Sequence, residues 1–149
     1  VITGCPIGGA TEKVVRLIEE SGAVVVAYEN CTGAKQYDRQ VSESGDPWEA
    51  LCGYYLAIGC SVMSPNPNRF ELLGRLCAQF AADGVIEMVL QSCHTYAVET
   101  YSVREFLKAR ELPFLSLETD YSPGDTARLK TRIAAFIGAI GAALSAGEV

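Results

Sequence analysis

A repeated change of hydrophobic pattern along the chain limits its possible folds more than any other feature. Short apolar runs alternate with longer segments in which apolar residues recur every three or four positions, as on one face of a helix. The clearest run is Ala23–Ala27 (AVVVA), a continuous series of the kind that forms a strand buried on both faces of a parallel sheet. Strands that alternate with helices favour an α/β fold with a parallel sheet.

The pattern predicts about five strands, each followed by a helix. We expect the strands at residues 1–3, 23–27, 58–63, 85–90 and 113–117. We expect the helices between Thr11 and Gly22, over residues 47–57, 69–82 and 96–110, and after Asp125. Five such units imply a Rossmann-like, doubly wound parallel sheet with helices on both faces, in a single domain over residues 1–149.

Composition excludes several classes of function. A net charge of −6 argues against nucleic acid or an anionic membrane as a partner, and we expect no apolar stretch to be long enough to span a bilayer. The apolar region Ile133–Leu144 is predicted to be a packing helix. Six cysteines without a secretion signal indicate reduced thiols in the cytoplasm. Because the chain begins inside an apolar run without a methionine, we expect it to be part of a longer protein.

Four of the six cysteines fall at the ends of predicted strands. Cys5, Cys31, Cys60 and Cys93 are separated by 26, 29 and 33 residues, about one strand–helix unit each. The carboxyl ends of parallel strands share one edge of a sheet, and ligands bind there. The other two cysteines, Cys52 and Cys77, lie within predicted helices beside apolar neighbours, and we interpret them as packing residues. Packing is also an alternative for the four strand-end cysteines.

If the strand-end thiols share a site, zinc, an iron–sulfur cluster and a redox disulfide are the alternatives. Zinc sites commonly use close pairs such as CxxC, which the chain lacks. The closely spaced cysteines of ferredoxins are absent as well. A cluster held by scattered thiolates is compatible with the pattern, because soft sulfur ligands suit iron–sulfur chemistry.

The only histidine, His94, follows Cys93 directly. Adjacent side chains in an extended segment point in opposite directions, so His94 is poorly placed to act as a base for Cys93. It is a candidate hydrogen-bond or proton donor, or simply the first residue of a helix. Glu29, Gln91 and Glu118 also follow predicted strands and are candidates for the substrate-facing edge, together with Cys5.

Several stretches, taken in order, are similar to one known family. They are TGCPIGGATEKV, YENCTGAK, IGCSVMSPNPNRFELL, LQSCHTYAVETYSVREFL and LETDYSPGDTARLKTRIAAF. Over roughly residues 1–140 they resemble the C-terminal domain of the 2-hydroxyacyl-CoA dehydratase/benzoyl-CoA reductase superfamily. The motifs YENC, GCS-M and CHTY are most similar to its double-cubane cluster branch.

The resemblance implies an enzyme with two Rossmann-like domains that enclose an oxygen-sensitive iron–sulfur cluster. An ATP-hydrolysing activator protein would deliver low-potential electrons one at a time. In the dehydratases a 2-hydroxyacyl-CoA becomes a ketyl radical and expels its hydroxyl group, and in benzoyl-CoA reductases an aromatic ring is reduced. In the double-cubane branch two [4Fe-4S] cubanes share a bridging sulfide, and each domain supplies three cysteines.

Carried onto this sequence, the resemblance implies that Cys31, Cys60 and Cys93 ligate the iron of a [4Fe-4S] or double-cubane cluster. Cys5 becomes a turn residue at the same edge. Val62 stands where many relatives are expected to carry a further cysteine, so any role of that thiol is missing here. The missing N-terminal domain leaves at best half a site, so the fragment alone should be inactive, and the face that it uncovers could support a homodimer.

A second hypothesis comes from another functional class. The chain could be a non-catalytic Rossmann-like binding or assembly domain whose cysteines merely pack. It would then be colourless under strict anaerobiosis, and substitutions at Cys31, Cys60 and Cys93 would be silent.

Overall fold

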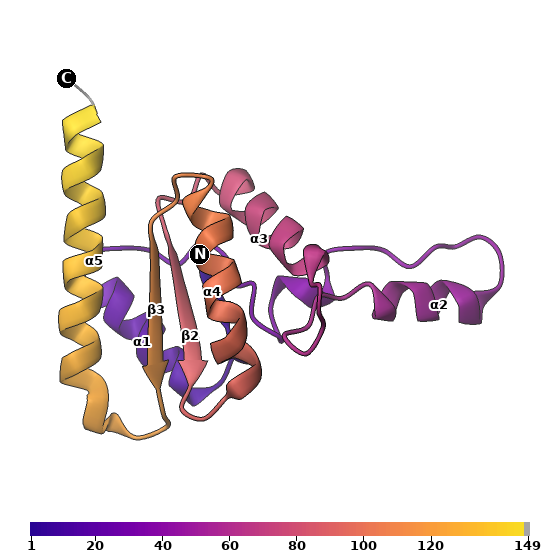
Figure 1. The fold of residues 1–149 in the computed structure, drawn as a ribbon, viewed down its shortest axis with the longest axis horizontal. Helices are drawn as coiled ribbons and strands as arrows, with labels where there is room; N and C mark the ends of the chain where they lie inside the picture. The colour runs from indigo at the N-terminus through magenta and orange to yellow at the C-terminus, as the bar shows by residue number, and fades with distance from the viewer. Residues whose placement is uncertain (148–149) are drawn as a thin grey trace.

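A parallel sheet with helices on both faces forms the body of the molecule (Figure 1). The computed structural model describes residues 1–147. The described strands are β1 (Ile2–Gly4), β2 (Val85–Leu90) and β3 (Phe114–Thr119), in the order β1-β2-β3, and both pairings are parallel. The expected α/β class and parallel sheet are therefore confirmed, whereas the expected count of five strands is not.

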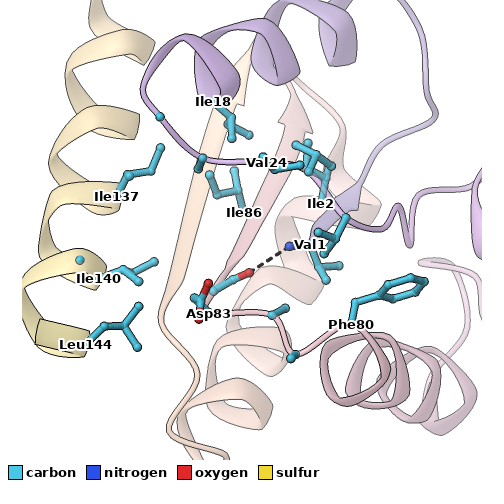
Figure 2. Close-up of a pocket in the computed structure, with 18 residues that line it drawn as sticks. Val1, Ile2, Ile18, Val24, Phe80, Asp83, Ile86, Ile137, Ile140 and Leu144 are labelled. Carbon is cyan, nitrogen blue, oxygen red and sulfur yellow. Dashed lines mark hydrogen bonds between the residues drawn. The ribbon is translucent and has the colours of Figure 1, made fainter. Parts of the chain in front are cut away.

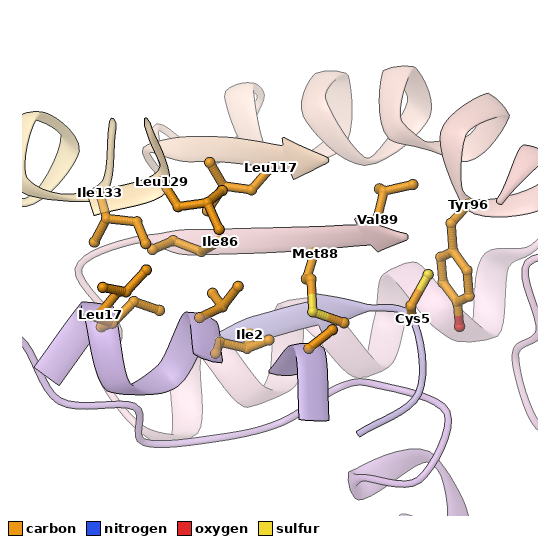
Figure 3. Packing of buried hydrophobic residues seen from close by; sticks show 13 residues of the cluster. Ile2, Cys5, Leu17, Ile86, Met88, Val89, Tyr96, Leu117, Leu129 and Ile133 are labelled. Atoms are coloured by element: carbon orange, nitrogen blue, oxygen red, sulfur yellow. The ribbon is translucent and has the colours of Figure 1, made fainter. Parts of the chain in front are cut away.

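Each face of the sheet is covered by a pair of helices. On one face, α1 (Gly9–Glu20) and α5 (Thr126–Gly147) pack on β2, in a core that contains Leu17, Met88 and Ile133 (Figure 3). On the other face lie α3 (Pro67–Gln79) and α4 (His94–Lys108), whose core includes Leu73 and Leu107. The apolar faces expected from the helical periodicity are the faces that pack on the sheet, because burial there removes one apolar stripe of each helix from water.

The AVVVA run at residues 23–27 is not a strand, and the expectation that both its faces are buried was wrong. It is an extended segment at the edge of the sheet, where Tyr28 forms a single bridge with Ile2 and the Val24 side chain is 77% exposed. Two hydrogen bonds attach it, from the Ile2 N–H to the Ala27 carbonyl (3.0 Å) and from the Glu29 N–H to the Ile2 carbonyl (2.8 Å). Because β1 has only three residues, it offers few groups for a longer ladder.

The segment 58–63 is also not a strand. It is a turn, in which the Met63 N–H donates to the Cys60 carbonyl at 2.9 Å. The loop that follows ends at Pro67, the first residue of α3. A short apolar run can be a strand or a turn, and it forms a strand only where another strand is available to pair with it.

Helix α2 (Pro47–Leu56) projects from the body on a long arm (Figure 1). Its start is as predicted, because the Asp46 carboxylate accepts hydrogen bonds from the N–H groups of Trp48 and Glu49 at 2.9 and 3.0 Å. No residue of α2 is buried. Cys52 is therefore exposed, and its interpretation as a packing residue was wrong, whereas Cys77 is buried in α3 as expected.

Helix α5 is longer than the predicted packing helix. The span Pro123–Ala146 is, by length and composition alone, apolar enough to cross a bilayer, which corrects the expectation that no stretch would be. Its first half is nonetheless part of the core, since Leu129 and Ile133 are fully buried against α1 and the sheet. Residues 141–146 of the helix are exposed.

An apolar hollow of about 430 Å³ lies where the second half of α5 faces the edge segment (Figure 2). Val24, Ile137 and Ile140 are among the residues that line it, together with Ile86 near the start of β2. This hollow therefore lies at the amino ends of the strands, away from the edge where the cysteines lie.

Candidate functional site

Three cysteines follow elements that end at the same edge of the sheet. Cys5 comes directly after β1, Cys93 precedes α4 just beyond the end of β2, and Cys31 follows the bridged residue Tyr28. Figure 3 shows Cys5 and Tyr96 beyond the carboxyl end of β2. Topology thus brings Cys5, Cys31 and Cys93, which are far apart in the sequence, to this edge. Cys60 was expected at the end of a strand as well, but it lies in a turn and follows no strand.

Cys5 is an interior residue of this edge. It is fully buried, and its sulfur accepts a hydrogen bond from the Leu90 N–H at 3.2 Å. Burial and the neighbouring Cys93 raise the pKa of the Cys5 thiol to about 11, although the Leu90 hydrogen bond acts in the opposite direction. Cys5 is therefore a neutral thiol at physiological pH, which suits a packing role rather than a ligand or nucleophile.

Cys93 has the opposite electrostatic character. Partial burial acts to raise the pKa of its thiol, but the polar groups of Tyr96 and Thr95 in the first turn of α4 outweigh it and hold that pKa below its ordinary value. Cys93 is the N-cap residue of α4 and lies at the positive end of the helix dipole, although its side chain makes no capping hydrogen bond. The half-buried Cys93 is thus prepared to carry negative charge.

Cys31 lies against the side chain of Tyr96, which belongs to α4. The Cys31 sulfur and the Tyr96 hydroxyl oxygen are 2.6 Å apart, and Tyr96 itself is buried. The Lys35 ammonium lies 3.3 Å from the same hydroxyl oxygen and 3.0 Å from a carboxylate oxygen of Glu29. The loop that carries Cys31 is therefore fixed to α4, the helix that begins next to Cys93.

Cys60 is linked to the same helix through Asn66. The Asn66 side-chain amide donates to the Cys60 carbonyl at 2.8 Å and to the Glu99 carboxylate of α4 at 2.6 Å. Beside these residues is a hollow of about 640 Å³. Its lining includes Ser61, next to Cys60, and His94, so the segments that carry Cys60 and Cys93 face one space.

A buried charge cluster lies behind the cysteines, at its centre the fully buried Arg69 of α3. Its guanidinium is 3.4 Å from Glu29, forms a close ion pair with Glu99, and is 3.8 Å from Glu87. It also donates to the Thr3 hydroxyl at 2.9 Å. Desolvation acts against the charge of Arg69, but the surrounding carboxylates outweigh it and raise the guanidinium pKa.

Sequence reasoning missed most of this cluster, although it left two signals. Glu87 interrupts the apolar run of β2, and a charge within such a run indicates a buried partner. Arg69 lies three and four positions before Leu72 and Leu73, on the apolar face of its helix. Lys35 and Tyr96 gave no comparable signal, because their burial depends on contacts between segments far apart in the chain.

The candidates for the substrate-facing edge differ in how far they are exposed. Glu29 is fully buried and ion-paired, so it lies behind the surface. Gln91 and Glu118 are exposed near the ends of β2 and β3, where the Gln91 N–H donates to the Thr119 carbonyl at 2.7 Å. His94 is exposed at the start of α4 and lines the hollow.

The cysteines do not form a site for a single metal ion in the described part of the chain. Within residues 1–147, no three His, Cys, Asp or Glu side chains come close enough together to hold one metal ion. An iron–sulfur cluster occupies the space between its ligands, so its thiolates need not converge on one point. Cys31, Cys60 and Cys93 are each half-buried, which is compatible with ligation of such a group.

Comparison with known proteins identifies the class. Residues 1–140 match the family described as 2-hydroxyglutaryl-CoA dehydratase, D-component, and the chain belongs to this family. It is 52% identical over 138 residues to an Escherichia coli (strain K12) protein described as "Putative dehydratase subunit YjiM". It is also 30% identical over 122 residues to one of the subunits of benzoyl-CoA reductase from Thauera aromatica. The resemblance to this superfamily is thus confirmed.

The aligned regions cover most of this chain but only a minor part of each relative. They include 92% and 80% of this chain, but only 36% and 28% of the Escherichia coli and Thauera aromatica proteins. The chain therefore spans about a third of the length of the curated relatives that it matches.

Proposed function

We propose that this chain is the cluster-binding domain of a radical dehydratase that acts on a 2-hydroxyacyl-CoA. The supporting observation is that three half-buried cysteines are each connected to α4: the Cys31 sulfur contacts Tyr96, the Cys60 carbonyl is linked to Glu99 through Asn66, and Cys93 is the N-cap. The 52% identity to a protein described as a dehydratase subunit favours dehydration. Reduction of a CoA thioester or a small molecule is the second candidate, favoured by the similarity to a benzoyl-CoA reductase.

In this proposal Cys31, Cys60 and Cys93 hold a [4Fe-4S] or double-cubane cluster, which supplies single electrons to the substrate when bound. The chain's own residues prepare the site. The start of α4 stabilises the Cys93 thiolate, and Tyr96 fixes the Cys31 sulfur. His94 lines the adjacent hollow, and as the only histidine in the sequence it is the candidate to donate a proton to a departing hydroxyl group.

The same proposal includes partners outside the described structure. The rest of a longer polypeptide would close the hollow, since the chain spans about a third of the relatives that it matches. An ATP-hydrolysing activator protein would supply the electrons, and the assembly would work in the cytoplasm. Exclusion of water from the closed hollow would strengthen electrostatic interactions between substrate and protein.

The test is an anaerobic reconstitution of the full-length protein with iron and sulfide. We expect each of the variants Cys31→Ser, Cys60→Ser and Cys93→Ser to lose bound iron and to alter the EPR spectrum of the reduced protein. Cys52→Ser is the matched control, because Cys52 is exposed on the projecting helix α2. This variant should bind as much iron as the unmodified protein. If all three variants retain the iron of the unmodified protein, the ligand assignment is wrong.

The same experiment separates the proposal from a non-catalytic role. A binding or assembly domain whose cysteines merely pack would stay colourless under strict anaerobiosis. A brown protein that loses iron on substitution, and that dehydrates a 2-hydroxyacyl-CoA when the activator is present, supports the dehydratase. A brown protein that reduces an enoyl-CoA or a small molecule but leaves the hydroxyacyl-CoA intact supports the reductase.

A further inference from the structure

The contacts of the Tyr96 hydroxyl group have a defined direction. Within residues 1–147 its oxygen has two hydrogen-bond neighbours, the Cys31 sulfur at 2.6 Å and the Lys35 ammonium at 3.3 Å. An ammonium group has donors and no acceptor, so Lys35 donates to the tyrosine oxygen. The single hydroxyl proton of Tyr96 is then left to point at the Cys31 sulfur.

Buried charged side chains restrict the positions of both Lys35 and Tyr96. The side chains of Lys35 and Glu29 are 2% and 0% exposed, and their ion pair of 3.0 Å keeps the ammonium next to the tyrosine. The Arg69 guanidinium lies over the Tyr96 ring, 4.9 Å from its centroid, which restricts the ring on that face. Reversing the Tyr96–Cys31 hydrogen bond would leave the buried hydroxyl proton without an acceptor among the described residues.

We infer that Tyr96 is a positioning residue that donates a hydrogen bond to the Cys31 sulfur when that sulfur ligates iron, with Lys35 fixing the direction. This inference rests on the proposed function, since it needs Cys31 as a ligand. A donor at a ligating thiolate stabilises the more negative, reduced state of the bound group. Tyr96 thereby raises the reduction potential, by hydrogen bonding to sulfur and not by contact with substrate.

The experiment uses the anaerobically loaded full-length protein and the variant Tyr96→Phe, which removes the hydroxyl group and keeps the ring. The matched control is Tyr101→Phe on the same helix, whose side chain is 68% exposed. An EPR-monitored redox titration compares the ratio of reduced to oxidised protein at a fixed applied potential. We expect this ratio to fall about tenfold in Tyr96→Phe, equivalent to about 59 mV for a one-electron couple, and to stay unchanged in the control.

A second measurement needs no variant. After exchange of the unmodified protein into D₂O, electron–nuclear double resonance should detect a deuteron coupled to the reduced group. Its absence overturns the inference even if Tyr96→Phe fails to fold. An unchanged reduced-to-oxidised ratio in a well-folded Tyr96→Phe also overturns it.

Iron content separates failure of the inference from failure of the proposed function. Unmodified protein that binds no iron, or a Cys31→Ser variant that retains all of it, overturns both. Iron that depends on Cys31, without the exchangeable deuteron or the shifted ratio, overturns the role of Tyr96 alone.

Discussion

Replacing Arg69 with methionine removes the guanidinium charge and keeps an unbranched apolar stem of similar length. In the folded protein this leaves Glu29, Glu87 and Glu99 buried, with Lys35 as the cation that remains at Glu29. Removing one partner of a buried ion pair costs about 3–5 kcal/mol, because the other charge stays uncompensated. That is a large share of the 5–15 kcal/mol by which domains are typically stable, as an order of magnitude.

The assay is urea unfolding at neutral pH, followed by far-UV circular dichroism. We expect the Arg69→Met midpoint to fall with little change in the dependence of unfolding free energy on urea. Arg16→Met is the control, because the Arg16 side chain is 67% exposed and pairs with Glu12 of the same helix at 2.8 Å. Exposed ion pairs contribute about 0–1 kcal/mol, so Arg16→Met should lose little unfolding free energy. If Arg69→Met loses no more unfolding free energy than Arg16→Met, the reasoning is refuted.

Two further predictions concern the sheet. Burial raises the pKa of Glu87, so the folded protein retains a proton that the unfolded chain releases, and stability should fall as pH rises from about 4.5 through the folded pKa. The free energy of unfolding, measured by urea at pH 5 and pH 8, should fall between these pH values in the unmodified protein and change less in Glu87→Gln. An equal fall in both proteins would contradict this prediction. Gly4 has φ +111° and an added Cβ would collide with the Met88 carbonyl, so Gly4→Ala should cost at least about 1–3 kcal/mol in thermal unfolding. Gly138→Ala in α5, where a Cβ meets open space, should be neutral or stabilising, and equal melting temperatures for the two alanine variants would contradict this account.

The parts of the fold that local periodicity determines could be predicted from the sequence. The strand at 85–90 was placed to the residue, because its apolar run is bounded by Gly84 and by the polar residues that follow it. Helix α3 was expected from the spacing of Leu72, Leu73 and Leu76, all of which are buried. In these elements the burial pattern and the backbone geometry favour the same structure.

The parts that depend on a distant partner could not be predicted. The run 23–27 has a stronger strand composition than β1, yet it is not a strand, and only the following residue, Tyr28, forms a bridge, because a strand requires a neighbour with matching groups. At the candidate site, the chain order of the cysteines indicated a shared edge. The burial of Cys5 and Glu29, and the contacts of Lys35 and Tyr96, depend on packing between remote segments, which no local pattern reports.

The spacing of the three candidate ligands also sets an order of events during biosynthesis. Cys31 and Cys93 are 62 residues apart, and their segments meet only when β2 pairs with β1, whose partners Ile2 and Ile86 are 84 residues apart. A nascent chain therefore has no neighbouring pair of thiols that could capture iron early, as a CxxC motif can. If these cysteines hold iron as proposed, closure of the sheet must come first, and bound iron would then mark chains that have finished folding.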